Sequence, residues 1–169
     1  CVPWATRCLM EPPLMLDAQE KTSWDLPDEA ATAALATRMA AAMHEGAVVY
    51  LHGPLGAGKT SFARALLTAL GVGERIKSPT YSLIEGYQAR AMPAWHLDLY
   101  RIADPGELEW LGLDALADPS ALVLVEWPER GAGALPAADV ALHMDYAGDG
   151  GRAALQVLTA RGERLRRRL

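Results

Sequence analysis

Apolar residues along the chain predict six strands. The continuous aliphatic runs at 47–51 and 121–125 are typical of strands that are covered on both faces, and the second is the most continuous run in the chain. Four further segments have the composition or the alternation of strands: 80–87, 94–100, 140–146 and 153–159. A glycine-rich turn at 148–151 joins the last two.

Helical spacing and end signals predict three helices between these strands. An alanine-rich stretch at 28–43 carries apolar residues at helical intervals, and a second helix is expected at 59–70, closed by Gly71. A short third helix opens at Asp104, because Asp caps a helix end and the following Pro fits the first helical position. Interleaved strands and helices predict an α/β fold with a mixed, mostly parallel central sheet and helices on both faces. The late hairpin adds antiparallel strands at one end.

Composition and charge restrict the classes of protein that fit. The 169 residues, 51% hydrophobic and 22% charged, suit one globular domain at 21–169, preceded by a flexible leader or cloning remnant at 1–20. A net charge of −5 argues against bulk binding to nucleic acid. Cys1 and Cys8 form no metal-ligand spacing, and no run approaches the roughly 18 apolar residues of a membrane span. We expect a cytoplasmic protein without membrane contact. The arginines of 161–169 could contact tRNA phosphates or form a basic, solvated C-terminal tail, and we expect the tail.

The segment 53–60, Gly-Pro-Leu-Gly-Ala-Gly-Lys-Thr, matches the phosphate-binding pattern G-x-x-x-x-G-K-[ST] between a predicted strand and a predicted helix. Glycines let successive N–H groups face a bound anion at the positive end of the helix dipole. Lys59 can reach the β- and γ-phosphates, and the Thr60 hydroxyl can bind Mg²⁺. The sequence therefore predicts a P-loop NTPase-like fold that binds ATP and Mg²⁺. The expected nucleotide contacts are Leu55, Gly56, Ala57, Gly58, Lys59, Thr60 and Ser61.

Hydrolysis needs a carboxylate that orients Mg²⁺ or the attacking water, and two are candidates. Glu126 follows the apolar run at 121–125 directly, and Asp98 lies in the predicted strand at 94–100. Thr80, in Ser-Pro-Thr-Tyr some twenty residues past the loop, is a candidate switch residue or part of a simple turn. Trp127 either lines the nucleotide site, faces a partner or packs in the core.

These motifs together resemble the bacterial TsaE family, the ATPase component of the machinery that makes threonylcarbamoyladenosine in tRNA. The resemblance rests on five segments in order, from about residue 24 to residue 152: GPLGAGKT at 53–60, KSPTYSLIEGY at 77–87, HLDLYR at 96–101, DPGELE at 104–109 and LVEWPERG at 124–131. Pro54 and Ser61 depart from the usual family residues without removing a functional group.

The resemblance implies roles for individual residues and for partners. It gives Lys59, Thr80, Asp98 and Glu126 to catalysis, Thr60 and Glu126 to Mg²⁺, and Trp127 to the nucleotide site. It also implies that the chain acts on a threonylcarbamoyl transferase subunit and its inactive paralogue, with tRNA contacted only indirectly. These partners modify the adenosine beside the anticodon of tRNAs that read codons beginning with A.

Two other functions remain open on the same loop. A small-molecule kinase would need an acceptor pocket and an arginine-rich lid, which the sequence does not indicate. An ATP-gated binding module would bind nucleotide and scarcely hydrolyse it. We expect slow intrinsic hydrolysis, with Arg101 and Arg130 as candidates for a cationic finger or for ordinary ion pairs.

Overall fold

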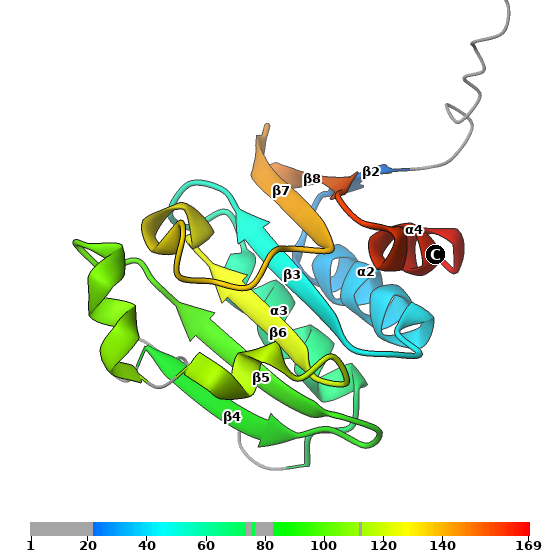
Figure 1. Cartoon of the computed structure of the whole chain (residues 1–169). Coiled ribbons are helices and arrows are strands. Elements are labelled where there is room, and N and C mark those ends of the chain that lie inside the picture. Colours follow the sequence, from blue (N-terminus) through cyan, green and yellow to red (C-terminus); the bar gives the residue numbers. More distant parts are fainter. Residues whose placement is uncertain (1–21, 74–75, 77–82, 112) are drawn as a thin grey trace, which may run out of the picture.

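A seven-stranded sheet organises the part of the chain that the computed structural model describes, which is residues 22–73, 76, 83–111 and 113–169. Its strands are β2 (Ser23–Leu26), β3 (Ala47–His52), β4 (Ile84–Gln88), β5 (Pro93–Asp98), β6 (Leu122–Glu126), β7 (Val140–Ala147) and β8 (Gly150–Val157). Their order across the sheet is β2-β8-β7-β3-β6-β5-β4 (Figure 1). The expected leader at 1–20 lies outside the described residues.

The centre of the sheet is parallel and its two edges are antiparallel. Strands β5, β6, β3 and β7 run in one direction. At one edge β4 is antiparallel to β5, and at the other β8 runs antiparallel to both of its neighbours, β7 and β2. Strand β6 lies between β3 and β5 and all five of its residues are buried, as its continuous aliphatic run predicts. The predicted α/β fold with a mixed sheet and a late antiparallel hairpin is confirmed.

Helices cover both faces of this sheet. They are α2 (Glu29–Ala42), α3 (Lys59–Ala69), α4 (Ala160–Arg167) and the 3₁₀ helices η2 (Pro105–Leu111), η3 (Leu113–Ala117) and η4 (Pro128–Gly131). Phe62 of α3 and Met39 of α2 lie in one apolar core against the sheet, whereas Leu108 of η2 and Leu116 of η3 belong to a second core on the other face. No helix in the described part of the chain is long and apolar enough to cross a membrane.

Aspartates cap two of the three predicted helices, and the cap at Asp104 was expected from the sequence. The Asp28 carboxylate accepts a hydrogen bond from the Ala31 N–H at 2.9 Å, and the Asp104 carboxylate accepts one from the Gly106 N–H at 3.1 Å. These bonds satisfy backbone donors that the first helical turn leaves free. The short third helix is a 3₁₀ helix rather than an α-helix.

Three predicted strands begin or end elsewhere. Strand β4 starts at Ile84, because Leu83 has a left-handed φ of 68° that no extended strand contains, and residues 80–82 lie outside the description. Strand β5 ends at Asp98, whose carboxylate accepts a hydrogen bond from the Tyr100 N–H at 3.1 Å and so turns the chain. Strand β8 begins at Gly150, because Gly148 with a φ of 62° allows a tighter turn than predicted.

Strand β2 was missing from the sequence-based prediction. Its four residues pair with β8, a strand far along the chain, so its partner is not visible in the local pattern. Trp24 and Leu26 face the core, and the two alternating residues are exposed.

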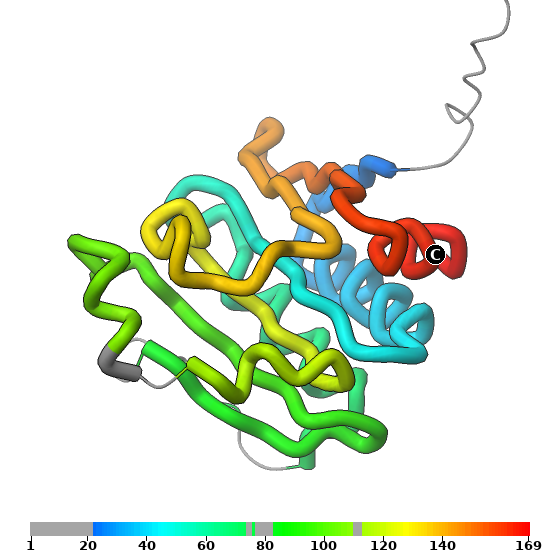
Figure 2. The backbone as a smooth tube through the Cα atoms, viewed as in Figure 1, coloured from blue at the N-terminus to red at the C-terminus, as the bar shows by residue number. Residues whose placement is uncertain are grey.

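The C-terminal arginines form a packed helix, so the prediction of a solvated tail is wrong. Thr159 caps α4 by accepting a hydrogen bond from the Gly162 N–H at 3.1 Å, and Leu165 lies in the core. Arg161 pairs with Asp139 at 2.8 Å. The backbone trace shows α4 at the same side of the molecule as β2, near the end of β8 (Figure 2).

Candidate nucleotide-binding site

The glycine-rich loop connects β3 to α3 and needs its glycines for close approach and for left-handed backbone. At Gly53, a side-chain Cβ would lie 2.3 Å from the Met144 carbonyl oxygen of β7. Gly58 has a φ of 101° and immediately precedes Lys59, the first residue of α3. The loop therefore passes against β7 and turns abruptly into the helix, which directs backbone N–H groups toward the helix mouth.

Lys59 lies inside this loop and is only 4% exposed. Its Nζ donates hydrogen bonds to the carbonyl oxygens of Gly53 at 2.6 Å and Pro54 at 2.9 Å, and it lies 4.3 Å from the centre of the Trp127 ring. Burial lowers the pKa of Lys59, and the nearby carboxylates, Glu126 foremost, act in the opposite direction. The loop thus holds a buried cationic group at its centre.

Glu126 joins α3 to β5 through its two carboxylate oxygens. Oε1 accepts a hydrogen bond from the Thr60 hydroxyl at 2.9 Å, and Oε2 lies 2.7 Å from Nε2 of His96. Glu126 is 2% exposed and His96 is 1% exposed. Because Thr60 is the second residue of α3 and Glu126 is the last residue of β6, this contact joins the loop helix to the central sheet.

Asp98 stands beside Glu126 at the end of the neighbouring strand. The two residues are paired in the parallel β5–β6 register, and Leu51 of β3 is the partner of Glu126 on its other side. Burial raises the pKa of Asp98 and the negative charge of Glu126 raises it further, while the Tyr100 N–H opposes both. Two carboxylates that repel each other at the C-terminal ends of neighbouring strands are typical of a site for a cation.

These groups open on one cavity of about 440 Å³. Its lining combines loop residues, carboxylates and aromatic rings: Leu55, Gly56, Gly58, Lys59, Thr60, Ser61, Asp98, Tyr100, Arg101, Glu126 and Trp127. All but one of these residues were named from the sequence as site or finger candidates, and Gly58 to Thr60, Asp98 and Glu126 come together from three separate segments. The additional residue is Tyr100, whose ring lies 5.0 Å from that of Trp127.

Among the described residues, Ala57 is the predicted site residue that does not line the cavity. Ala57 packs against the core beneath the loop, and its N–H donates to the Pro54 carbonyl at 3.1 Å. Thr80 lies outside the described residues. His96 was not singled out from the sequence, although alternation in β5 puts it on the same face as Asp98 and so carried the signal.

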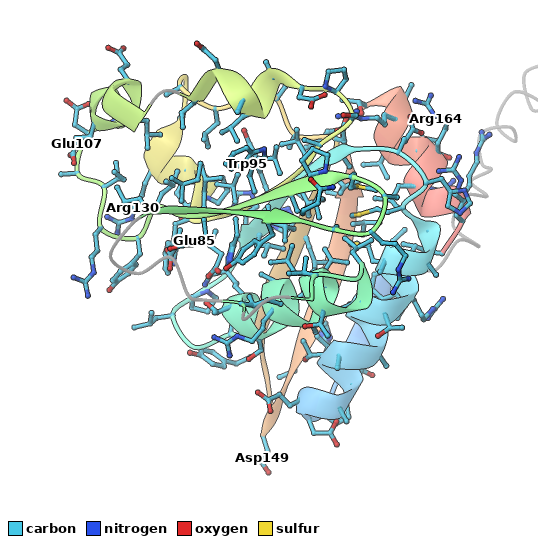
Figure 3. The ribbon with its side chains drawn as sticks, turned by 90° about the horizontal axis from the view of Figure 1, so that it is seen from below. Glu85, Trp95, Glu107, Arg130, Asp149 and Arg164 are labelled. Carbon is cyan, nitrogen blue, oxygen red and sulfur yellow. The ribbon has the colours of Figure 1, made fainter. Side chains whose placement is uncertain are left out.

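The two candidate finger arginines occupy different positions. Arg101 lines the cavity. The guanidinium of Arg130 lies 5.3 Å from the centre of the Tyr100 ring and 5.6 Å from that of Trp127. Figure 3 shows Arg130 at the side of the molecule opposite to Arg164 of α4. The Arg130 guanidinium is therefore close to both aromatic rings.

The residues present fit a triphosphate and Mg²⁺. Gly56 has a left-handed φ of 82° and lines the cavity without a side chain, so the loop offers a cradle of backbone atoms. The cradle holds an ammonium group, and a hydroxyl and a carboxylate lie 2.9 Å apart at its edge. Hard oxygen donors of this kind, next to phosphate-binding amides, are the chemistry that Mg²⁺ with a nucleotide requires.

Comparison with known proteins gives the same family as the motifs. The family model described as threonylcarbamoyl adenosine biosynthesis protein TsaE matches residues 26–154. The chain is 45% identical over 102 residues to the tRNA threonylcarbamoyladenosine biosynthesis protein TsaE of Haemophilus influenzae, covering 60% of this chain and 65% of that protein, just under two thirds. The protein of the same name from Bacillus subtilis is 35% identical over 130 residues, covering 77% of this chain and 81% of its own length.

A solved structure supports the same relationship. The crystal structure of Bacillus subtilis YdiB superimposes with a TM-score of 0.71 at 30% sequence identity, covering 85% of this chain and 89% of that one. The region matched by the family model, residues 26–154, contains β3, α3, β5 and β6, which supply the loop and both carboxylates. The chain belongs to the TsaE family.

Proposed function

We propose that this chain binds ATP and Mg²⁺ at the 53–60 loop and hydrolyses ATP slowly, in support of threonylcarbamoyladenosine formation on tRNA. The observation that carries the proposal is the contact between Thr60 and Glu126 at 2.9 Å beside the buried Lys59. It brings a cation ligand pair and a phosphate-binding ammonium into one cavity. Family membership supports the link to tRNA modification.

In this proposal, the groups that line the cavity bind the phosphates, hold Mg²⁺ and orient the attacking water. The loop amides and Lys59 bind the phosphates, and the two carbonyl contacts of Lys59 keep its ammonium inside the loop. Thr60 and Glu126 hold Mg²⁺, which when bound neutralises negative charge on the phosphate oxygens. Asp98 or Glu126 orients the attacking water, and Thr80 is the candidate switch residue that senses the bound state.

Slow turnover by the isolated chain is expected from the cationic groups at the site. P-loop enzymes reach high rates when an arginine finger neutralises charge in the transition state. Arg101 lines the cavity and Arg130 is not part of its lining, so Arg101 is the better placed of the two candidates. We propose that the cytoplasmic partners, the threonylcarbamoyl transferase subunit and its inactive paralogue, complete the site and accelerate hydrolysis.

The test compares the wild type, Lys59→Ala and a control, Arg38→Ala, which removes an exposed cation of α2 outside the cavity. We expect Lys59→Ala to lower ATP hydrolysis in the complex with both partners by about a hundredfold or more, because it removes a preorganised charge from the developing transition state. Arg38→Ala should match the wild type. Equal rates for wild type and Lys59→Ala would end the proposal, as would phosphorylation of a small molecule in place of phosphate release.

A further inference from the structure

His96 is buried beneath the nucleotide cavity without lining it. It lies on β5, two residues before Asp98 and on the same face of the strand. In the β5–β6 register it is paired with Leu124, so its ring reaches diagonally across to Glu126 at the strand end. Asp98 and Glu126 line the cavity, whereas His96 is absent from its lining. His96 therefore does not touch a ligand in this cavity directly, and its hydrogen bond leads to Glu126.

The contact with Glu126 is the one polar contact of the His96 ring among the described residues. An ionised carboxylate can only accept hydrogen bonds, so the proton of the 2.7 Å contact belongs to His96 Nε2. The other ring nitrogen, Nδ1, is buried and has no hydrogen-bond partner in the described part of the chain. Among the described residues, the imidazole therefore hydrogen-bonds to this carboxylate alone and does not belong to a longer hydrogen-bond network.

Such a donor has a specific effect on a buried glutamate. The last torsion of a Glu side chain is broad, so a carboxylate that lacks fixed partners rotates freely about it. Here one oxygen is held by His96 and the other faces Thr60 at 2.9 Å. The histidine also stabilises negative charge that burial would otherwise penalise. Fixed in this way, Glu126 presents Oε1 toward the proposed Mg²⁺ ligand Thr60.

We infer that His96 is a positioning residue that orients Glu126 for Mg²⁺ and thereby sets how strongly Mg²⁺ enhances nucleotide binding. This inference rests on the proposed function. It gives β5 two separate tasks, since Asp98 lines the cavity and His96 holds the carboxylate of the neighbouring strand from behind. Partners of this kind, one layer behind a metal ligand, typically change metal affinity by 10- to 100-fold.

The experiment compares His96→Gln with His96→Asn. Both carry the same amide, but the glutamine N–H reaches the position of Nε2 and the asparagine N–H falls one methylene short of it. Calorimetry measures ADP binding to each free protein with Mg²⁺ and with EDTA. We expect His96→Asn to lose about tenfold of the Mg²⁺-dependent gain in ADP affinity and His96→Gln to stay within about threefold of the wild type. Affinities in EDTA should be equal for all three.

The control is Leu97→Ala, which removes a buried side chain from the opposite face of β5. It should lower the melting temperature through the cavity that it leaves, with an unchanged Mg²⁺-dependent gain. Equal behaviour of His96→Gln and His96→Asn, or a loss that appears equally in EDTA, overturns the positioning role. A wild type that does not bind ADP overturns the proposed function itself, so the two failures are distinguishable.

Discussion

Two groups of buried charges in this molecule are built in opposite ways. Asp139, before β7, accepts four hydrogen bonds, from the Val48 N–H at 2.8 Å, the Thr159 hydroxyl at 2.6 Å, and Arg161 Nε at 3.0 Å and Nη2 at 2.8 Å. At the nucleotide cavity, Asp98 and Glu126 stand side by side with like charge. Asp139 is satisfied by hydrogen bonds from its own partners, whereas Asp98 keeps a like-charged neighbour.

The difference separates a structural cluster from a functional one. Burial alone would raise the pKa of Asp139, but the hydrogen bonds from Arg161, Thr159 and Val48 lower it below its usual range. The pKa of Asp98 is raised instead, by burial and then by Glu126. Like-charged carboxylates that His96 and Lys59 offset only in part are typical of a site that binds a ligand. Substitutions in the two groups should therefore act on different measurable properties.

The largest effect is expected from Glu126→Gln, which keeps the shape and removes the charge. Loss of a Mg²⁺ ligand should lower ATP hydrolysis about a hundredfold. The free energy of unfolding should not fall, because Asp98 loses a like-charged neighbour. Hydrolysis in the partner complex and urea unfolding measure the two properties. A less stable protein with an intact rate would reverse the assignment of this group.

Asp139→Asn should show the converse pattern. It removes charge-assisted hydrogen bonds to Arg161 and should lower the free energy of unfolding by about 2 kcal/mol. ADP binding with Mg²⁺ should be unchanged at a temperature where the variant is folded. Asp25→Asn is the matched control: it alters an aspartate whose side chain is 83% exposed, and should cost less than about 0.5 kcal/mol. If nucleotide affinity falls with Asp139→Asn, the two groups are coupled.

Acid should lower the contribution of Asp139 to the free energy of unfolding by less than the Asp139→Asn substitution does. Because the folded-state pKa of Asp139 is lowered, its contribution to stability is present above the unfolded pKa of about 3.9 and is lost as pH falls through the folded value. Urea unfolding at pH 7 and below pH 4 should show a steeper loss for wild type than for Asp139→Asn. Parallel pH profiles would mean that other carboxylates cause the acid sensitivity.

The smallest effect is expected at the exposed end of α4. The pKa of Glu163 falls to about 2, first because Arg166 hydrogen-bonds to it, with Arg167 contributing less. The Arg167 side chain is 71% exposed and 3.2 Å from Glu163, so Arg167→Ala should cost at most about 0.5 kcal/mol. Thermal unfolding at low and high salt measures this change. A loss comparable to that of Asp139→Asn would show that the helix depends on its surface arginines.

Local signals predicted the elements that hold the nucleotide loop. The 53–60 motif, the caps at Asp28 and Asp104 and the apolar run of β6 each lie within a few neighbouring residues, so a single sequence contains them. The carboxylates Asp98 and Glu126 were found because each follows or interrupts a strand pattern. The role of Thr80 stays a prediction, since it lies outside the described residues.

Long-range contacts explain what the sequence did not predict. Strand β2 exists because β8 lies beside it, and the two are joined only by tertiary pairing. Helix α4 is packed because Arg161 meets Asp139, which in turn binds the Val48 N–H 91 positions away. The basic C-terminus and an Asp that follows a proline-containing loop are, by residue type alone, equally typical of solvated segments.

Leu51, Glu126 and Asp98 are neighbours in the parallel register of β3, β6 and β5, so the site depends on which face of its strand each residue occupies. Adjacent residues of a strand point to opposite faces, so one inserted amino acid in β5 would turn His96 and Asp98 to the η2 and η3 side together. The same insertion at the Gly148 turn would lengthen the β7–β8 hairpin, and the residues of β5 and β6 would keep their faces of the sheet. Length changes in this chain should therefore be tolerated at its outer hairpin and rejected within β5 and β6.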